Sequence, residues 1–252
     1  MLKVEQVRAI MPRLTAARAG ALLPVLDSAI REFAIDRPAR TAAFLAQLAH
    51  ESAEFRFMEE LWGPTPAQRR YEPPGRLAAD LGNTEPGDGR RFKGRGPIQI
   101  TGRANYRRFG ELLGLDLIAA PARAAAPDVG FRIAGLFWSR KGLNELADQA
   151  TGAAFREITR RINGGLNGLG ERQRYYRVAR TVLGVVGPVR SGEAPAAPVR
   201  PADEPPLERG WEAIRADARR DARRPSARPR TTGSRSRGSV PKGGKRARRK
   251  SG

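Results

Sequence analysis

The chain has 252 residues, a formal net charge of +21, one histidine and no cysteine. The lack of cysteine excludes disulfides and a cysteine nucleophile, and one histidine argues against zinc, which usually takes several nitrogen or sulfur ligands. A serine–histidine triad would have to use His50, and no G-x-S-x-G motif is present. We therefore expect no metal and no cofactor, which leaves carboxylates as the natural catalytic groups.

Composition divides the chain into two parts. All Phe and Tyr residues lie before residue 185, and Pro, Arg, Ser, Gly and Lys dominate beyond it. We predict one folded domain at 1–184, large enough for a sizeable core, followed by a Pro-rich linker and a basic, largely disordered tail at 185–252. Residues 213–252 carry 15 Lys and Arg against 2 Asp. A short helix around Trp211 is the one element expected there.

Hydrophobic periodicity predicts a mainly α domain. Two short helices are expected within 4–35, and single helices at 40–57, 102–114, 128–141, 152–163 and 170–184. Residues 63–97 are rich in Pro and Gly, which predicts a long loop of the kind that is usually functional. A short alternating run at 97–101 is the one candidate strand. No run is long enough to cross a bilayer, and no signal peptide is recognisable.

Residues 40–57 show the most regular helical pattern. At about 100° per residue, Glu51 lies beside Leu48 and Phe55 at the border of the apolar face, and Glu54 is turned about 60° further toward solvent. Apolar neighbours raise the pKa of a carboxyl group, so Glu51 suits a general acid. The alternative is a boundary glutamate on an amphipathic helix.

An inverting glycoside hydrolase also needs a second carboxylate, roughly 6.5–9.5 Å from the first, that activates water. The pattern of residues does not choose a base. The candidates that follow the acid are Glu54, Glu59, Glu60, Glu72 and Glu85.

Two glycine-containing stretches place polar amides near turns. In KGRGPIQITGRANY (93–106), Gln99, Thr101 and Asn105 bring neutral hydrogen-bonding groups together, as a sugar-binding cleft requires; an ordinary tight turn is the alternative. In ITRRINGGLNGLGERQRYY (158–176), a helix is expected to end at Asn163. That residue either caps the helix or points its amide into the same cleft.

These stretches, in this order, resemble the family 19 glycoside hydrolases, especially the compact phage and prophage endolysins. The matching segments are FLAQLAHESAEF (44–55), YEPPGR (71–76), DLGNTEPGDGRRFKGRGPIQITGRANY (80–106) and INGG (162–165). The resemblance implies a lysozyme-like, mostly α, two-lobed fold with a central cleft. It also implies an inverting mechanism.

Matched residue by residue, the resemblance makes Glu51 the general acid and Glu72 the best match for the general base. It implies that Thr101 helps the base to hold its water and that Arg172 structures the surroundings of the acid. The substrate-contacting amides would be Gln99, Asn105 and Asn163. Plant members carry an acidic residue where this chain has Asn167, so the Arg172 network is expected to be reorganised.

The leading hypothesis is hydrolysis of a β-1,4 glycan that contains N-acetylglucosamine. Compact size and the lack of disulfides and of a signal peptide favour peptidoglycan. The protein would then be a monomeric endolysin, made in the cytoplasm and acting at the cell wall or periplasm after a separate protein permeabilises the membrane. The alternatives are a chitinase acting on chitin oligomers and an inactive protein that binds glycan or envelope. The basic tail suits an anionic envelope surface or nucleic acid, or it is solubilising and has no target.

Overall fold

The computed structural model describes residues 1–186, and helices make up the regular structure in that range. The elements are α1 (Val4–Ile10), α2 (Ala16–Glu32), α3 (Pro38–Glu51), α4 (Pro66–Arg69), α5 (Arg76–Asp80), α6 (Asp88–Arg91), α7 (Arg103–Leu113), the 3-10 helix η1 (Pro121–Ala125), α8 (Pro127–Arg140), α9 (Leu143–Asp148), α10 (Gly152–Asn163) and α11 (Leu169–Val182).

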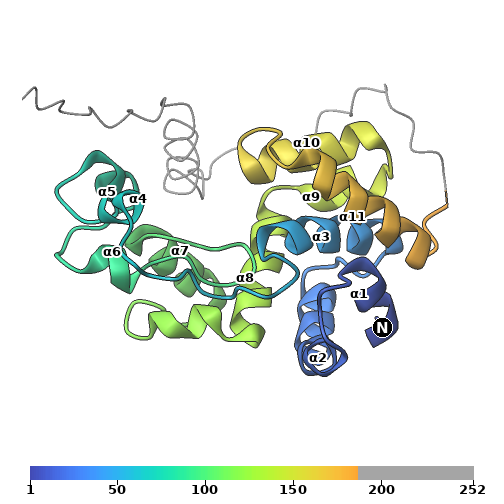
Figure 1. Cartoon of the computed structure of the whole chain (residues 1–252), viewed down its shortest axis with the longest axis horizontal. Helices are drawn as coiled ribbons and strands as arrows, with labels where there is room; N and C mark the ends of the chain where they lie inside the picture. The colour runs from blue at the N-terminus through green and yellow to red at the C-terminus, as the bar shows by residue number, and fades with distance from the viewer. Residues whose placement is uncertain (187–252) are drawn as a thin grey trace, which may run out of the picture.

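The helices form two groups (Figure 1). Helices α1–α3 and α9–α11 lie together at one end of the molecule, and α4–α7 lie at the other. Helix α8 runs between the groups and contacts both α2 and α7. The prediction of a mainly α, two-lobed fold is therefore confirmed for the described residues.

The larger lobe is centred on α3, which packs along α11. Small side chains line α3 and let the neighbouring helices approach closely. Four alanines of α3 are completely buried: Ala42, Ala43, Ala46 and Ala49. Phe44 fills the space beside them and meets Trp138 of α8 edge to face, with ring centroids 5.3 Å apart. This packing makes α3 a rigid support for whatever lies at its C-terminal end.

The segment predicted as a long loop contains three short helices, α4, α5 and α6. Each has four or five residues, which is too short for a helical repeat of apolar residues to be visible in the sequence. A small cluster of Tyr71, Leu77 and Leu81, with Trp62 packed against it, forms a second apolar core in this segment. The strand considered at 97–101 does not form in the described structure, where Arg95 makes isolated bridges with Glu59 and Ile100.

The helix predicted over 40–57 ends at Glu51 instead. Ser52 Oγ donates to the Leu48 carbonyl (2.7 Å) and accepts from the Phe55 amide (2.8 Å). These two hydrogen bonds close a non-helical turn where the helix was expected to continue. Glu54 consequently points inward and is 2% exposed. The expected solvent-facing position of Glu54 was wrong because helical periodicity stops at the residue before this turn.

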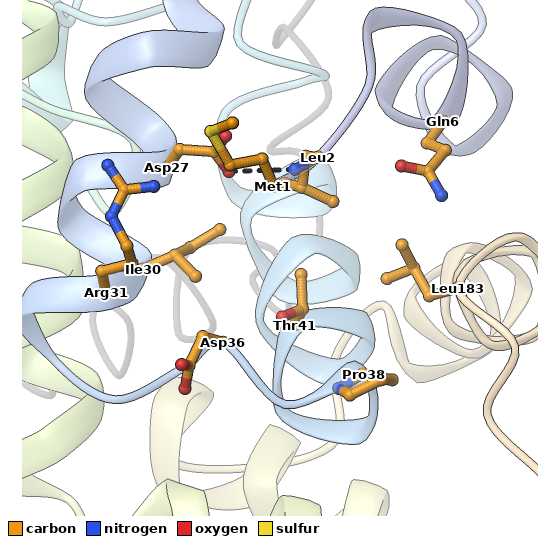
Figure 2. Close-up of a pocket in the computed structure, with 10 residues that line it drawn as sticks. All are labelled: Met1, Leu2, Gln6, Asp27, Ile30, Arg31, Asp36, Pro38, Thr41 and Leu183. Atoms are coloured by element: carbon orange, nitrogen blue, oxygen red, sulfur yellow. Dashed lines mark hydrogen bonds between the residues drawn. The ribbon is translucent and has the colours of Figure 1, made fainter.

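A hollow of about 330 Å³ lies among α1, α2, α3 and the end of α11 (Figure 2). Leu2, Ile30 and Leu183 contribute apolar walls, and the Asp27 carboxylate accepts from the Leu2 amide at 3.3 Å. Its α3 residues, Pro38 and Thr41, belong to the first turn of that helix. Glu51 ends the same helix about 20 Å away, so this hollow is separate from the predicted catalytic centre.

The predicted linker and tail, including the helix around Trp211, lie outside the described residues except for positions 185 and 186. Within residues 1–186, none of the helices combines the length and the apolar character that a membrane span needs.

Candidate active site

Glu51 closes α3 and faces the first turn of α11. Its Oε1 accepts a hydrogen bond from Arg172 Nη2 at 2.6 Å, and the two side chains are only 9% and 1% exposed. Arg172 Nη1 also donates to Gln47 Oε1 at 2.5 Å. Gln47 in turn donates to Thr159 of α10 at 2.9 Å. The predicted partnership of Arg172 with the candidate acid is therefore present in the structure.

This ion pair changes the expected environment of Glu51. A carboxyl group among purely apolar neighbours favours its neutral form, whereas an adjacent guanidinium favours the carboxylate. The packing of Leu48 and Phe55 in the core is as expected. Helical periodicity did not indicate that Arg172, 121 residues away, contacts Glu51; the family resemblance alone pointed to this residue. In the structure Glu51 is therefore paired with the guanidinium group of Arg172.

The loop after α10 brings Asn163 to the same network. Asn163 Nδ2 and Arg172 Nε both donate to the main-chain carbonyl of Asn167, at 3.2 and 3.4 Å. Arg172 is thus held by the backbone carbonyl of Asn167 as well as by the side chains of Glu51 and Gln47. The expected reorganisation of this network relative to the plant members stays a prediction.

His50 forms a second link between α3 and α11. Its Nδ1 lies 2.8 Å from Glu171 Oε2. Gly168 packs on the ring with φ +69°, and a Cβ at this position would lie 2.3 Å from His50 Cε1. Burial lowers the pKa of His50, and the charge of Arg172 lowers it further.

The predicted amide-rich turn lies in the segment before α7. Asn105 Nδ2 donates to the Thr101 carbonyl at 2.8 Å, and Thr101 Oγ1 donates to the Gln99 carbonyl at 3.0 Å. Gln99 Nε2 donates to the Gly96 carbonyl at 2.8 Å. The structure therefore brings together Gln99, Thr101 and Asn105. Thr101 and Asn105 are buried, whereas Gln99 is half-buried.

Glu60 is held against this turn by backbone pairing. The Gly96 amide donates to the Met58 carbonyl (2.9 Å), and the Glu60 amide donates to the Gly94 carbonyl (2.8 Å). The Glu60 carboxylate accepts from the Gly94 amide at 2.9 Å and from Gln68 Nε2 at 2.9 Å. Both donors are uncharged.

Gly94 separates the side chains of Glu60 and Gln99. A Cβ at this position would come within 2.7 Å of Gln99 Oε1 and 3.3 Å of Glu60 Oε2. A side chain at position 94 would therefore displace Gln99, Glu60 or both, and glycine lets a candidate base and a predicted substrate-binding amide approach the same backbone position.

Two other candidate bases are paired with cationic side chains. Glu54 accepts from Arg13 and from the Tyr175 hydroxyl. Glu59 lies 3.2 Å from Lys93 and 2.9 Å from Arg95. Partial burial opposes ionisation of Glu59, but the hydrogen bond from Lys93 and the charge of Arg95 outweigh it and lower its pKa.

Glu72 and Glu85 belong to the helical segment of the smaller lobe. Glu85 is mostly exposed and lies 2.9 Å from Arg103. Glu72 lies between α4 and α5, at the end of the molecule opposite α3 (Figure 1). Its carboxylate accepts from the amides of Gly87 (2.8 Å) and Arg90 (3.2 Å) at the start of α6. The role of Glu72 as the base stays a prediction.

Comparison with known proteins supports the same family. The family model described as chitinase class I, of glycoside hydrolase family 19, matches residues 32–150. A Haemophilus influenzae protein named as containing a glycosyl hydrolase family 19 domain is 38% identical over 159 residues, which is 54% of this chain and 76% of the relative. Endochitinase At2g43610 of Arabidopsis thaliana is 41% identical over 126 residues, which is 49% of this chain and 39% of the relative.

Solved structures show the same fold. Chitinase C from Streptomyces griseus superposes with a TM-score of 0.56 at 24% identity, and the match covers 72% of this chain and 92% of that chain. A class IV chitinase from Zea mays gives a TM-score of 0.50 at 26% identity, over 67% and 83% of the two chains. The chain spans about half or less of the plant relatives' length, but three quarters of the bacterial relative. The chain belongs to the family 19 glycoside hydrolases.

Proposed function

We propose that this glycoside hydrolase cleaves β-1,4 linkages of a glycan containing N-acetylglucosamine by inversion, with Glu51 as the acid and Glu60 as the base. The observation that carries the proposal is the position of Glu60 beside Gln99, held by two uncharged donors. Within residues 1–186, the hydrogen-bond donors to the Glu60 carboxylate are the Gly94 amide and the Gln68 side-chain amide, so a carboxylate oxygen faces Gln99 without a cationic donor there.

The two glutamates divide the proton transfers. Glu51 gives its proton to the glycosidic oxygen as the bond to the anomeric carbon breaks, and Glu60 takes a proton from the water that attacks the opposite face of that carbon. Arg172 then stabilises the Glu51 carboxylate, which it already contacts at 2.6 Å. Glu51 has to be protonated when it acts, so the catalytic cycle includes proton uptake by Glu51 before each cleavage.

Glu72 is the alternative base, and the family resemblance supports it. Its two backbone donors at the start of α6 support a structural role instead. Gln99, Thr101, Asn105 and Asn163 remain the proposed substrate-binding residues.

Charge supports peptidoglycan as the substrate. Residues 1–186 contain 29 Lys and Arg against 19 Asp and Glu. Peptidoglycan strands carry peptide carboxylates and chitin is neutral, so a cationic enzyme is attracted to the former over a longer range. The endolysin role, with action at the cell wall after release from the cytoplasm, follows from this choice. Chitin oligomers are the second candidate, since the plant relatives are named endochitinases.

Mass analysis of released products tests the proposal. The purified chain and a Glu51→Gln variant are incubated with peptidoglycan sacculi and with chitin oligomers. We expect the wild-type chain, and not the Glu51→Gln variant, to release hydrolytic fragments with new reducing ends from sacculi. Activity confined to chitin would overturn the peptidoglycan assignment, and anhydro-sugar products would contradict hydrolysis. Binding without any release would support the inactive binding protein.

The basic residues beyond 212 are proposed to draw the enzyme to anionic envelope surfaces. Deleting residues 207–252 is expected to slow lysis of intact envelopes at low salt, where exposed charges are least screened. An unchanged rate at low salt would leave the tail without this role. The nucleic-acid alternative would be favoured if the tail affects only nucleic-acid binding. In that case the full chain is retained on a nucleic-acid column and the deleted chain is not.

A further inference from the structure

An unusual turn joins the two proposed catalytic glutamates. Directly after Glu51 and Ser52, the residues Ala53, Glu54 and Phe55 have φ values of +49°, +62° and +60°. Non-glycine residues rarely occupy this left-handed region singly, and three in succession are unfavourable without support from their surroundings. The chain then runs toward Glu60.

The Glu54 carboxylate supplies part of that support. It is 2% exposed and accepts from the Arg13 amide at 2.6 Å, from Arg13 Nε at 2.9 Å and from the Tyr175 hydroxyl at 2.8 Å. Arg13 Nη2 also donates to the Tyr175 hydroxyl at 3.2 Å. The turn is thereby tied both to the connection between α1 and α2 and to α11.

A second tie comes from α2. Arg18 donates to the Phe55 carbonyl through both Nε (3.0 Å) and Nη2 (2.7 Å). Phe55 itself is fully buried and meets Phe131 of α8 edge to face, with centroids 5.1 Å apart. Three different parts of the larger lobe therefore fix the backbone of residues 53–55.

Glycine would satisfy the φ of +62° at position 54 without any of these contacts. A buried carboxylate is costly unless it is fully paired. The presence of a buried glutamate at position 54, where glycine would suit the backbone, indicates that its hydrogen bonds to Arg13 and Tyr175 hold the turn. Because the turn leaves α3 at Glu51 and leads to Glu60, any movement of it changes the position of one glutamate relative to the other.

We propose that Glu54, held by Arg13 and Tyr175, is a positioning residue that fixes the spacing of Glu51 and Glu60. The proposal rests on the proposed function, in which those two glutamates act together. Glu54 does not touch the reacting atoms. It acts through the rigidity of the left-handed turn.

Steady-state kinetics on a soluble oligomer of the cleaved glycan test this role. For Glu54→Ala we expect kcat per folded molecule to fall by about tenfold to a hundredfold with KM changed by less than about twofold, because misplaced catalytic groups slow chemistry more than binding. Glu54→Gln keeps an acceptor oxygen for Tyr175 and Arg13 and is expected to recover part of the loss. An unchanged kcat for folded Glu54→Ala would overturn the proposal.

A matched control separates positioning from stability. Asp148 is another carboxylate paired with an arginine, Arg40 at 2.5 Å, on α9. Asp148→Ala is expected to lower Tm and leave kcat unchanged. If Glu54→Ala does not fold, Tyr175→Phe removes only one donor and is expected to lower kcat about threefold. A purely structural role would lower Tm for Tyr175→Phe and leave its kcat at the wild-type value.

Hydrogen–deuterium exchange gives a readout that does not depend on activity. In Glu54→Ala, or in Tyr175→Phe, we expect amides of residues 52–60 to exchange faster while α3 and α11 keep their protection. Unchanged amide exchange of residues 52–60 in these variants would show that Glu54 does not hold the turn, even if the enzyme is active. If wild-type protein cleaves no glycan, the proposed function fails, and the exchange result still decides whether Glu54 holds the turn.

Discussion

The two proposed catalytic carboxylates are held in different ways. Glu51 ends a long helix and is fixed by the buried Arg172 of a second helix. Glu60 lies on an irregular segment and is fixed by backbone pairing with residues 94–96 and by the Gln68 amide. A guanidinium group lies 2.6 Å from the Glu51 carboxylate, whereas the Glu60 carboxylate accepts from two uncharged amides.

The helix and the irregular segment therefore fix their glutamates through different interactions. The packing of α3 on α11 determines where Glu51 lies. The pairing of 58–60 with 94–96, and the close approach that Gly94 permits, determine where Glu60 lies. The turn at 53–55 links the two regions, so the site depends on both.

The largest effect is expected for Glu51→Gln. The amide cannot donate the acid proton, although its oxygen can still accept from Arg172, so kcat should fall by about 10²–10⁴-fold with little change in Tm. Steady-state rates and thermal melts of the purified variant check this. Retention of more than a tenth of wild-type kcat would remove Glu51 from the acid role.

Glu60→Gln and Glu72→Gln sharpen the comparison between the two candidate bases. We expect Glu60→Gln to lower kcat by about 10²–10⁴-fold. Glu72→Gln should keep kcat and lose about 1 kcal/mol of stability, because weaker hydrogen bonds then reach the amides of Gly87 and Arg90. Denaturant unfolding and rates of both variants give the answer. The reverse pattern of activities would assign the base to Glu72.

A smaller effect is expected for Gly94→Ala. The added Cβ would lie 2.7 Å from Gln99 Oε1, so it must displace Gln99, Glu60 or both, and kcat/KM should fall by about tenfold. Gly20→Ala is the matched control, because a Cβ there has no neighbour within 4 Å and Gly20 lies within α2. Equal activities of the two variants would show that the close approach at Gly94 is not needed for catalysis.

The smallest effect concerns pH. His50 is the one histidine in the chain, and burial together with Arg172 lowers its pKa from 6.5 in the folded state. The unfolded chain therefore binds the proton first as pH falls. The stability associated with neutral His50 is present above about pH 6.5 and is lost as pH falls through the lower folded value. Melting curves between pH 7 and 5 should show a smaller loss of Tm for His50→Gln, and identical slopes would contradict the assignment.

The sequence predicted the helical half of the site well. Periodicity placed Glu51 on a rigid helix, and the family resemblance identified Arg172, which the structure pairs with Glu51. Gln99, Thr101 and Asn105 were also correctly expected to lie together. These features follow from helical repeats and from short-range spacing, both of which are visible in a sequence.

The part of the site that lies on irregular segments was harder to predict for a physical reason. Glu60 meets Gly94 from 34 residues away, through backbone hydrogen bonds that impose no residue pattern. The inward turn of Glu54 depends on Arg13 and Tyr175, which are 41 and 121 residues away. Helical periodicity extended past Glu51 because Ser52 and Phe55 still fit the apolar face, although the backbone there is no longer helical.

The anomeric configuration of the first product tests the central claim most directly. Proton NMR of a soluble β-1,4 oligomer, recorded before mutarotation equilibrates the sugar, reports which face of the anomeric carbon the water attacked. A base on one side and an acid on the other predict that the newly formed reducing end is the α anomer. Release of the β anomer would show retention and would contradict the assignment of Glu51 and Glu60 as an acid and base acting on opposite faces.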